Sequence, residues 1–105
     1  MSNRFLGEAS AQVDGKVWTL RCDFNAMAEF EGATGQDAMT AFEAAEDGEV
    51  SVVDLRHLVR ACLLRHHPEA TLRDAGDVLS QDMGVVQRLI AASMPTEGEA
   101  AALGN

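Results

Sequence analysis

The stretch AQVDGKVWTLRCDFNAMAEFE, residues 11–31, contains a strand pattern, a tight turn and the start of a helix. At its centre are Asp14 and Gly15, one of the strongest two-residue hairpin signals, because a type I′ turn needs a positive φ angle at both positions. A two-residue loop at this point pairs Val13 with Lys16. The pattern therefore predicts that residues 7–13 and 16–22 form an antiparallel hairpin.

Side-chain alternation along the two predicted strands gives the hairpin one apolar face, because successive side chains of a strand point to opposite sides. On this face small residues stand opposite large ones. An isolated hairpin is barely stable in water, so we expect the following helices to cover the apolar face. Its members are Ala9, Ala11, Val13, Trp18 and Leu20.

The first predicted helix follows the hairpin directly. Asp23 can cap its N-terminus, because the carboxylate accepts hydrogen bonds from the free N–H groups of the first turn. Gly32 and Gly35 interrupt the helical pattern. The expected inward side chains are Phe24, Met27, Ala28 and either Phe30 or Glu31.

Residues 37–47 and 51–67 each fit a helix. The first is short and ends at Gly48, and the second begins at Ser51 and is stopped by Pro68. Apolar residues recur at three- and four-residue steps, the period of a helix with one buried face. The expected inward side chains are Met39, Phe42 and Ala45 in the first helix, and Val52, Leu55, Leu58, Val59, Cys62 and Leu63 in the second.

Two more helices are predicted before Pro95. One begins at Thr71, with Asp74 in the position of a capping box, and the last covers residues 82–94. Each has one apolar stripe. The expected inward side chains are Leu72, Ala75, Val78 and Leu79 in one, and Met83, Val86, Leu89, Ile90 and Ser93 or Met94 in the other.

This order of elements predicts an α+β fold, in which an N-terminal two-stranded antiparallel hairpin packs against a bundle of four to five short helices. The length of 105 residues argues for one domain. We assign residues 7–95 to that domain. We expect residues 1–6 to be a flexible N-terminus and residues 96–105 to be a disordered tail, because the tail is small, polar and contains glycine.

The formal net charge is −9. So acidic a surface disfavours binding to nucleic acid or to an anionic membrane, because it repels phosphate groups. The charge suits either a partner with a basic patch or a well-solvated surface, and composition does not separate these two. The N-terminus lacks the apolar core of a signal peptide, and no apolar run is long enough to span a membrane. We therefore expect a cytoplasmic protein.

Motifs for catalysis and cofactor binding are missing from the sequence. It contains no phosphate-binding loop, dinucleotide glycine motif, zinc-protease motif, serine-hydrolase motif or calcium loop. Cys62 and His66 are four residues apart, a spacing that can share a metal. The favoured interpretation places Cys62 in the core, and His66 and His67 at a helix C-terminus, where they meet free carbonyls. We expect no enzymatic activity, no cofactor and no metal.

The two cysteines, Cys22 and Cys62, do not form a CxxC motif. A single disulfide between them stays open on spacing alone, although the predicted compartment favours reduced thiols.

Methionine and phenylalanine side chains near the helices suggest a surface for another protein. Methionine is flexible and apolar, so it fills gaps in a core and also lines adaptable protein-binding grooves. Core packing is the ordinary role of each residue taken alone. The candidates for a protein-binding surface are Met27, Phe30, Met39, Phe42, Met83 and Met94.

Several of these segments together resemble a known family. They are the hairpin GEASAQVDGKVWTLRC, the helix start FNAMAEFE with the glycine-containing turn after it, and the amphipathic helix from residue 51. The chain resembles, over about residues 3–95, the small tail-assembly proteins of gene transfer agents and related prophages of alphaproteobacteria. That family is grouped with phage tail assembly chaperones and has also been labelled tail-tube-like.

The resemblance implies a non-enzymatic role in building a phage-like tail, with the tape-measure protein and the tail-tube subunit as partners. It transfers no catalytic residues and no agreed binding motif to this chain. It also leaves room for a structural component retained in the finished particle. A small thiol or metal protein using Cys62, His66 and Cys22 is the remaining alternative.

Overall fold

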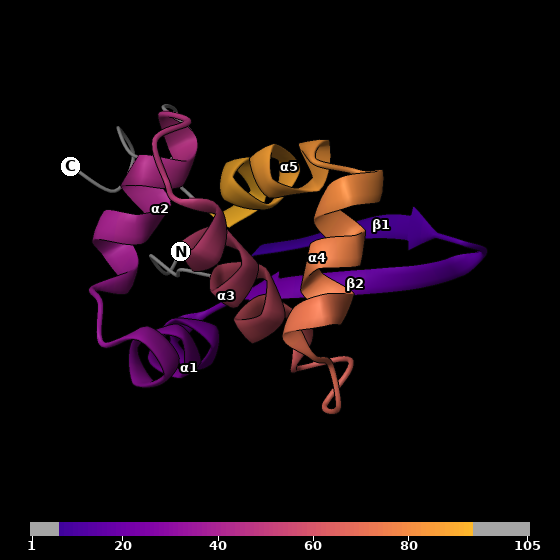
Figure 1. Cartoon of the computed structure of the whole chain (residues 1–105), viewed down its shortest axis with the longest axis horizontal. Helices are drawn as coiled ribbons and strands as arrows, with labels where there is room; N and C mark the ends of the chain where they lie inside the picture. Colours follow the sequence, from indigo (N-terminus) through magenta and orange to yellow (C-terminus); the bar gives the residue numbers. More distant parts are fainter. Residues whose placement is uncertain (1–6, 94–105) are drawn as a thin grey trace, which may run out of the picture.

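The computed structural model describes residues 7–93, which form two strands and five helices (Figure 1). The predicted α+β fold, with an N-terminal hairpin packed on helices, is confirmed. Residues 1–6 and 96–105, expected to be flexible or disordered, lie outside the described part. The elements are β1 (Gly7–Val13), β2 (Lys16–Cys22), α1 (Phe24–Thr34), α2 (Ala38–Glu46), α3 (Val52–Leu63), α4 (Leu72–Gln81) and α5 (Gly84–Ser93).

The hairpin has the predicted register. Val13 pairs with Lys16 across the turn, and the antiparallel pairing continues to Gly7 opposite Cys22. Asp14 has a φ angle of 52° and Gly15 one of 82°, so both turn residues adopt the left-handed conformation that the sequence signal requires.

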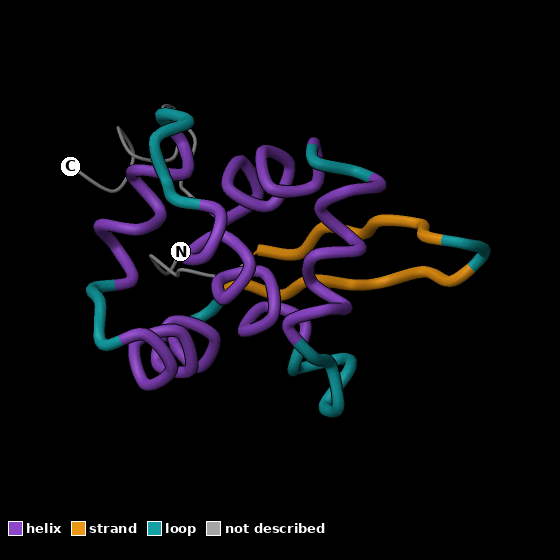
Figure 2. The backbone as a smooth tube through the Cα atoms, in the orientation of Figure 1, coloured by secondary structure: helices purple, strands orange, loops and turns teal. Residues whose placement is uncertain are grey.

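The helices cover one face of this hairpin. β1 packs against α5 and α4, and β2 packs against α3. Figures 1 and 2 show α4 crossing the two strands, with the turn projecting beyond the helices. The predicted apolar face is the covered one, since Ala11, Val13 and Leu20 are buried and Ala9 and Trp18 are partly buried against the core.

Two side chains, one from α5 and one from the segment after α3, contact the middle of the two sheet edges. The Nη2 atom of Arg88 donates a hydrogen bond of 2.8 Å to the carbonyl oxygen of Ser10 on β1. On β2, the backbone N–H of Thr19 donates to Nε2 of His67 at 3.0 Å. Unpaired backbone groups at a sheet edge are a template for pairing with other chains, so these two contacts protect the edges.

The predicted N-caps of three helices are present. The side chains of Asp23, Ser51 and Thr71 each accept a hydrogen bond from the backbone N–H three residues later. The Thr71 cap is a full capping box, because the Asp74 carboxylate also accepts from the N–H of Thr71 at 3.0 Å.

The inward face of α1 differs from the predicted one. Phe24 is 69% exposed and Ala28 is also exposed, whereas Ala26, Met27 and Phe30 are buried. Phe24 is the first residue of the helix, and the buried side chains begin only at Ala26. The pattern identified the helix and its buried residues Met27 and Phe30 correctly, but it wrongly placed Phe24 and Ala28 inward and missed Ala26.

The two ends of the described chain meet in space. The backbone of Gly7, at the start of β1, lies against the last turn of α5, where a Cβ atom at position 7 would stand 2.5 Å from the carbonyl carbon of Ala92. Real Cβ atoms do not approach so closely, so this contact requires glycine.

Candidate protein-binding groove

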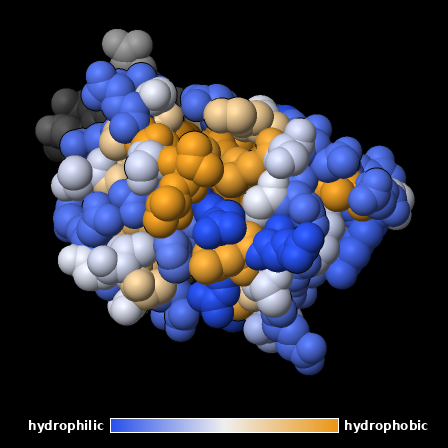
Figure 3. Space-filling model, viewed as in Figure 1, coloured by the Kyte–Doolittle hydropathy of each residue, from blue (hydrophilic) through white to orange (hydrophobic). Residues whose placement is uncertain are grey.

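An apolar groove lies where the ends of several helices meet. The C-terminal end of α2, its connection to α3, the first turn of α3 and the start of α5 form the walls of a cavity of about 370 Å³. Figure 3 shows an apolar patch in this region, between the start of α3 and α5. Of its lining residues, Gln87 alone has a polar side chain and none is charged. They are Ala45, Gly48, Val50, Val52, Leu55, Met83, Gly84, Val86 and Gln87.

Two large apolar side chains on the groove are uncovered. Val52 is 76% exposed and Met83 is 67% exposed, while Leu55 and Val86, one helical step further on, are buried. The helical period places Val52 and Met83 on the inward stripes of α3 and α5. Val52 is the first residue of α3 and Met83 directly precedes α5, so both lie beyond the parts of these helices that pack on the core. The apolar stripes thus extend beyond the core that covers them. Burial of either side chain by a partner would contribute about 1.5–3 kcal/mol to the free energy of binding.

The negative charge of the chain is concentrated in one segment, which includes the α2 end and the α3 start of this groove. Residues 22–55, which include α1, α2 and the start of α3, contain nine of the 17 carboxylates and none of the eight lysines and arginines. The rest of the chain has eight of each, so the net charge of −9 belongs to this one segment. Charge is therefore segregated to one part of the fold.

Three of these carboxylates alternate with groove-lining residues. Glu46, Asp47 and Glu49 are exposed and flank Gly48, and none has an ion-pair partner within residues 7–93. They also lie at the C-terminal end of α2, which has no basic residue in its last turn. The C-terminal end of a helix dipole is negative and favours cations. The three carboxylates therefore add to a negative potential that no basic side chain of the last turn of α2 offsets.

The family model described as "Phage tail tube protein, GTA-gp10" matches residues 6–102, nearly the whole chain. The chain belongs to this family. The resemblance stated from the sequence motifs is thereby confirmed. No curated protein and no solved structure matches the chain.

Membership makes the chain a tail protein of phages or gene transfer agents, of the tail assembly chaperone or tail tube class. The family is typically non-enzymatic and implies interaction with other tail proteins. Among the described residues, no helix is both long and apolar enough to cross a bilayer. A groove with an apolar lining suits a site that meets another protein.

The six residues suggested as a binding surface separate into two groups. Met27, Phe30 and Phe42 are buried in the core, because they lie on the helix faces that pack against neighbouring elements. The suggested surface is corrected by removing these three. Met39 and Met83 are exposed, and Met83 lines the groove. Met94 lies outside the described residues.

Sequence reasoning did not select the other groove residues. Val50, in the connection before α3, and Val52 were not among the candidate surface residues, and Val52 was expected inward. The signal that could have found them is the acidic run from Glu46 to Glu49 directly before an apolar segment, at a helix end where cations are normally favoured.

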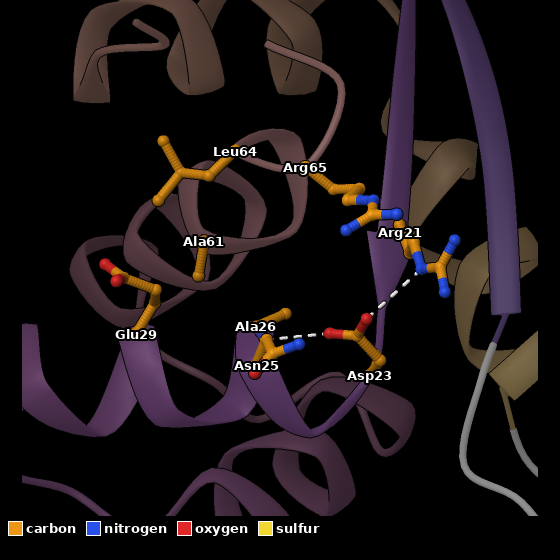
Figure 4. A pocket seen from close by; sticks show the side chains of 8 residues that line it. All are labelled: Arg21, Asp23, Asn25, Ala26, Glu29, Ala61, Leu64 and Arg65. Carbon is orange, nitrogen blue, oxygen red and sulfur yellow. Dashed lines mark hydrogen bonds and ion pairs between the residues drawn. The ribbon is translucent and has the colours of Figure 1, made fainter. Parts of the chain in front are cut away.

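A second cavity, of about 310 Å³, lies at the junction of β2, α1 and α3 and has a polar lining (Figure 4). One carboxylate oxygen of Asp23 accepts from the N–H of Ala26 at 2.9 Å, and the other accepts from Nε of Arg21 at 3.1 Å. Figure 4 shows these bonds linking the end of the strand to the first turn of the helix. These polar groups hold the junction together, so we assign this cavity a structural role.

The cysteine and histidine residues are engaged elsewhere. Cys22 and Cys62 are free thiols, fully buried, and the hydrogen bond with Cys22 together with burial raises the pKa of Cys62 well above its usual range. α3 ends at Leu63, so His66 and His67 lie beyond the helix and not in its last turn as expected, since a residue before proline disfavours helical backbone. His66 contacts Glu8 at 2.8 Å. Within residues 7–93 no three histidine, cysteine or acidic side chains cluster as metal ligands would.

Proposed function

We propose that this protein is a tail assembly chaperone that binds the tape-measure protein, the tail-tube subunit or both through the apolar groove during tail assembly. A long helical tape-measure chain exposes apolar stripes before it is enclosed. A small acidic carrier with an open apolar groove would shield such stripes and keep the complex in solution.

The observation that carries this proposal is the pair of uncovered side chains on the groove. Val52 and Met83 continue the apolar stripes of two helices, yet they are 76% and 67% exposed. Apolar side chains gathered at one concave site, with a polar surround, are typical of protein interaction sites.

Co-expression with the tape-measure protein and, separately, with the tail-tube subunit of the same particle tests this function. The expected result is that at least one partner co-purifies with the chain and becomes more soluble in its presence. If neither partner co-purifies and neither gains solubility, the chaperone proposal is wrong.

A matched pair of double variants locates the site. Val52→Gln with Met83→Gln changes the groove, whereas Val17→Gln with Met39→Gln changes an exposed valine and an exposed methionine outside it. We expect the groove variant to bind the partner at least about tenfold more weakly, about 1.4 kcal/mol, and the control variant to bind like the wild type. Equal losses in the two variants would place the site elsewhere.

The family description favours one second function, because it names a tail tube protein. In that case the chain would be a structural subunit retained in the particle. Quantitative mass spectrometry of purified particles separates the two functions. A chaperone should be absent or scarce, whereas a structural subunit should be present in a fixed ratio to the other tail proteins.

A further inference from the structure

We propose that the groove accepts an amphipathic α-helix whose apolar stripe is flanked by lysine and arginine side chains. This inference rests on the protein-binding role proposed above and specifies the chemistry of the partner. Its basis is the contrast between the uncharged lining of the groove and its acidic rim, which consists of Glu46, Asp47 and Glu49.

The apolar lining of the groove indicates the kind of molecule that can bind there. Eight of its nine residues have no polar side-chain group, so the groove offers apolar contact and almost no hydrogen bonding. A small-molecule site of similar volume usually has several convergent polar groups that fix the ligand, and Gln87 alone does not provide them. Apolar side chains of another protein match this lining better.

The walls favour a helix over an extended strand. A strand adds to a sheet by main-chain hydrogen bonds, and no residue of β1 or β2 lines the groove. The middle of each sheet edge is also occupied, by Arg88 on β1 and by His67 on β2. A helix needs no such edge, because it docks through apolar side chains three and four residues apart.

The acidic residues of the rim favour a partner with positive charge. Glu46, Asp47 and Glu49 lie between the lining residues of the α2 end and have no basic partner within residues 7–93. The dipole of α2 adds to their negative potential. Lysine and arginine on the flanks of a docked helix would neutralise this potential, and would also speed association by electrostatic attraction.

The same charges argue against two other occupants. The chain segment 94–105 contains Glu97 and Glu99 and no lysine or arginine, so the acidic rim would repel it. A second copy of the chain would offer no strongly basic surface, because outside residues 22–55 the acidic and basic residues are equal in number.

Fluorescence anisotropy with labelled peptides of about 18 residues, roughly 27 Å of helix, tests the proposal on the full chain. One peptide is amphipathic with lysine flanks, the second has glutamate at the same flanking positions, and the third is a scrambled form of the first. We expect the lysine peptide to bind at least about tenfold more tightly than the other two, because like charges repel across an interface. Comparable binding of the scrambled peptide would reduce the effect to non-specific charge attraction and overturn the proposal.

Two triple variants with the same change in net charge separate the rim from the overall charge. The rim variant is Glu46→Gln, Asp47→Asn and Glu49→Gln, and the control is Glu29→Gln, Glu69→Gln and Asp77→Asn. We expect the rim variant to lose about tenfold in affinity for the lysine peptide and much of its salt dependence, and the control to keep both. Equal effects in the two variants would overturn the proposal.

The outcomes distinguish this inference from the chaperone function. If the tape-measure protein needs Val52 and Met83 but the rim variant and the glutamate peptide bind normally, the function stands and the basic helix is overturned. If the lysine peptide binds as expected but no tail protein does, the groove chemistry stands and the function falls. Self-association that the groove variant abolishes and the lysine peptide fails to displace would make a second copy the occupant, and would also overturn the proposal.

Discussion

The imidazole of His67 accepts a hydrogen bond of 3.0 Å from the backbone N–H of Thr19 and so closes the outer edge of β2. The Nε2 atom is the acceptor, and therefore this nitrogen carries no proton in the folded state. The ring also lies 4.8 Å from that of Trp18, between centroids. Burial, and then the positive charges of Lys16 and His66, lower the pKa of His67 below its ordinary value of 6.5, against an opposing effect of Asp74.

This contact predicts that the protein loses stability in weakly acidic solution. The unfolded chain takes up a proton on His67 near pH 6.5, whereas the folded chain does so only at lower pH. The contribution of His67 is therefore fully present above pH 6.5 and is lost as the pH falls towards its lowered pKa. Urea unfolding between pH 7.5 and 5.5 measures it.

His67→Gln supplies the comparison, because an amide oxygen can accept from Thr19 without titrating. We expect a flatter pH dependence in this variant than in the wild type. His57→Gln is the matched control, since His57 lies within α3 and is not among the groups that shift the pKa of His67. Identical slopes in the wild type and in His67→Gln would contradict the assignment.

Alanine substitutions at two glycines should change stability in opposite directions. Gly7→Ala places a methyl group 2.5 Å from backbone atoms of Ala92 and Ser93, so we expect a loss of about 1–3 kcal/mol or more from forced displacement of α5. Gly32→Ala lies within α1 and meets no atom within 4 Å, so it should gain about 0.5–1 kcal/mol from higher helix propensity. Thermal unfolding of both variants measures the difference, and a neutral Gly7→Ala would mean that the contact is looser than described.

Two methionines should respond differently to truncation. Met27 is 5% exposed and Met39 is 44% exposed, and both lie in helices. Met27→Ala should cost about 2–5 kcal/mol because it leaves a cavity in the core. Met39→Ala should stay within about 0.5 kcal/mol of the wild type, as is usual for a surface position. Chemical denaturation of both variants measures these effects, and similar losses would contradict the assigned burial.

Neither thiol should react in the folded protein. Cys22 and Cys62 are fully buried, and the mutual hydrogen bond and burial raise the pKa of Cys62, so the reactive thiolate is scarce. We expect labelling by an aromatic disulfide reagent at pH 8 to proceed only as fast as the structure opens, and to be complete in denaturant. Glu69→Cys provides an exposed thiol for comparison. Rapid labelling of the wild-type thiols would show that the hairpin does not cover them.

The sequence was sufficient for features that local chemistry determines. Asp14 and Gly15 predicted the hairpin and its register, because the turn geometry admits few residue types. Asp23, Ser51 and Thr71 predicted three helix starts, because their side chains satisfy backbone groups within one turn.

Features that depend on a second element were beyond the sequence pattern. A helical period predicts which side chains share a face but not whether another element covers that face. Val52 and Met83 therefore looked like core residues and are exposed. The contacts of Cys22 with Cys62 and of Thr19 with His67 join residues about 40 to 50 positions apart, and no local pattern records such a meeting.

The contact between Gly7 and the end of α5 orders events during synthesis. β1 packs against α5, the last helix of the described residues, so a nascent chain cannot complete the cover over the apolar face of its hairpin until α5 has been made. Until then the part of this face that α5 covers stays open to other chains, and the fold closes only after its last helix has been made.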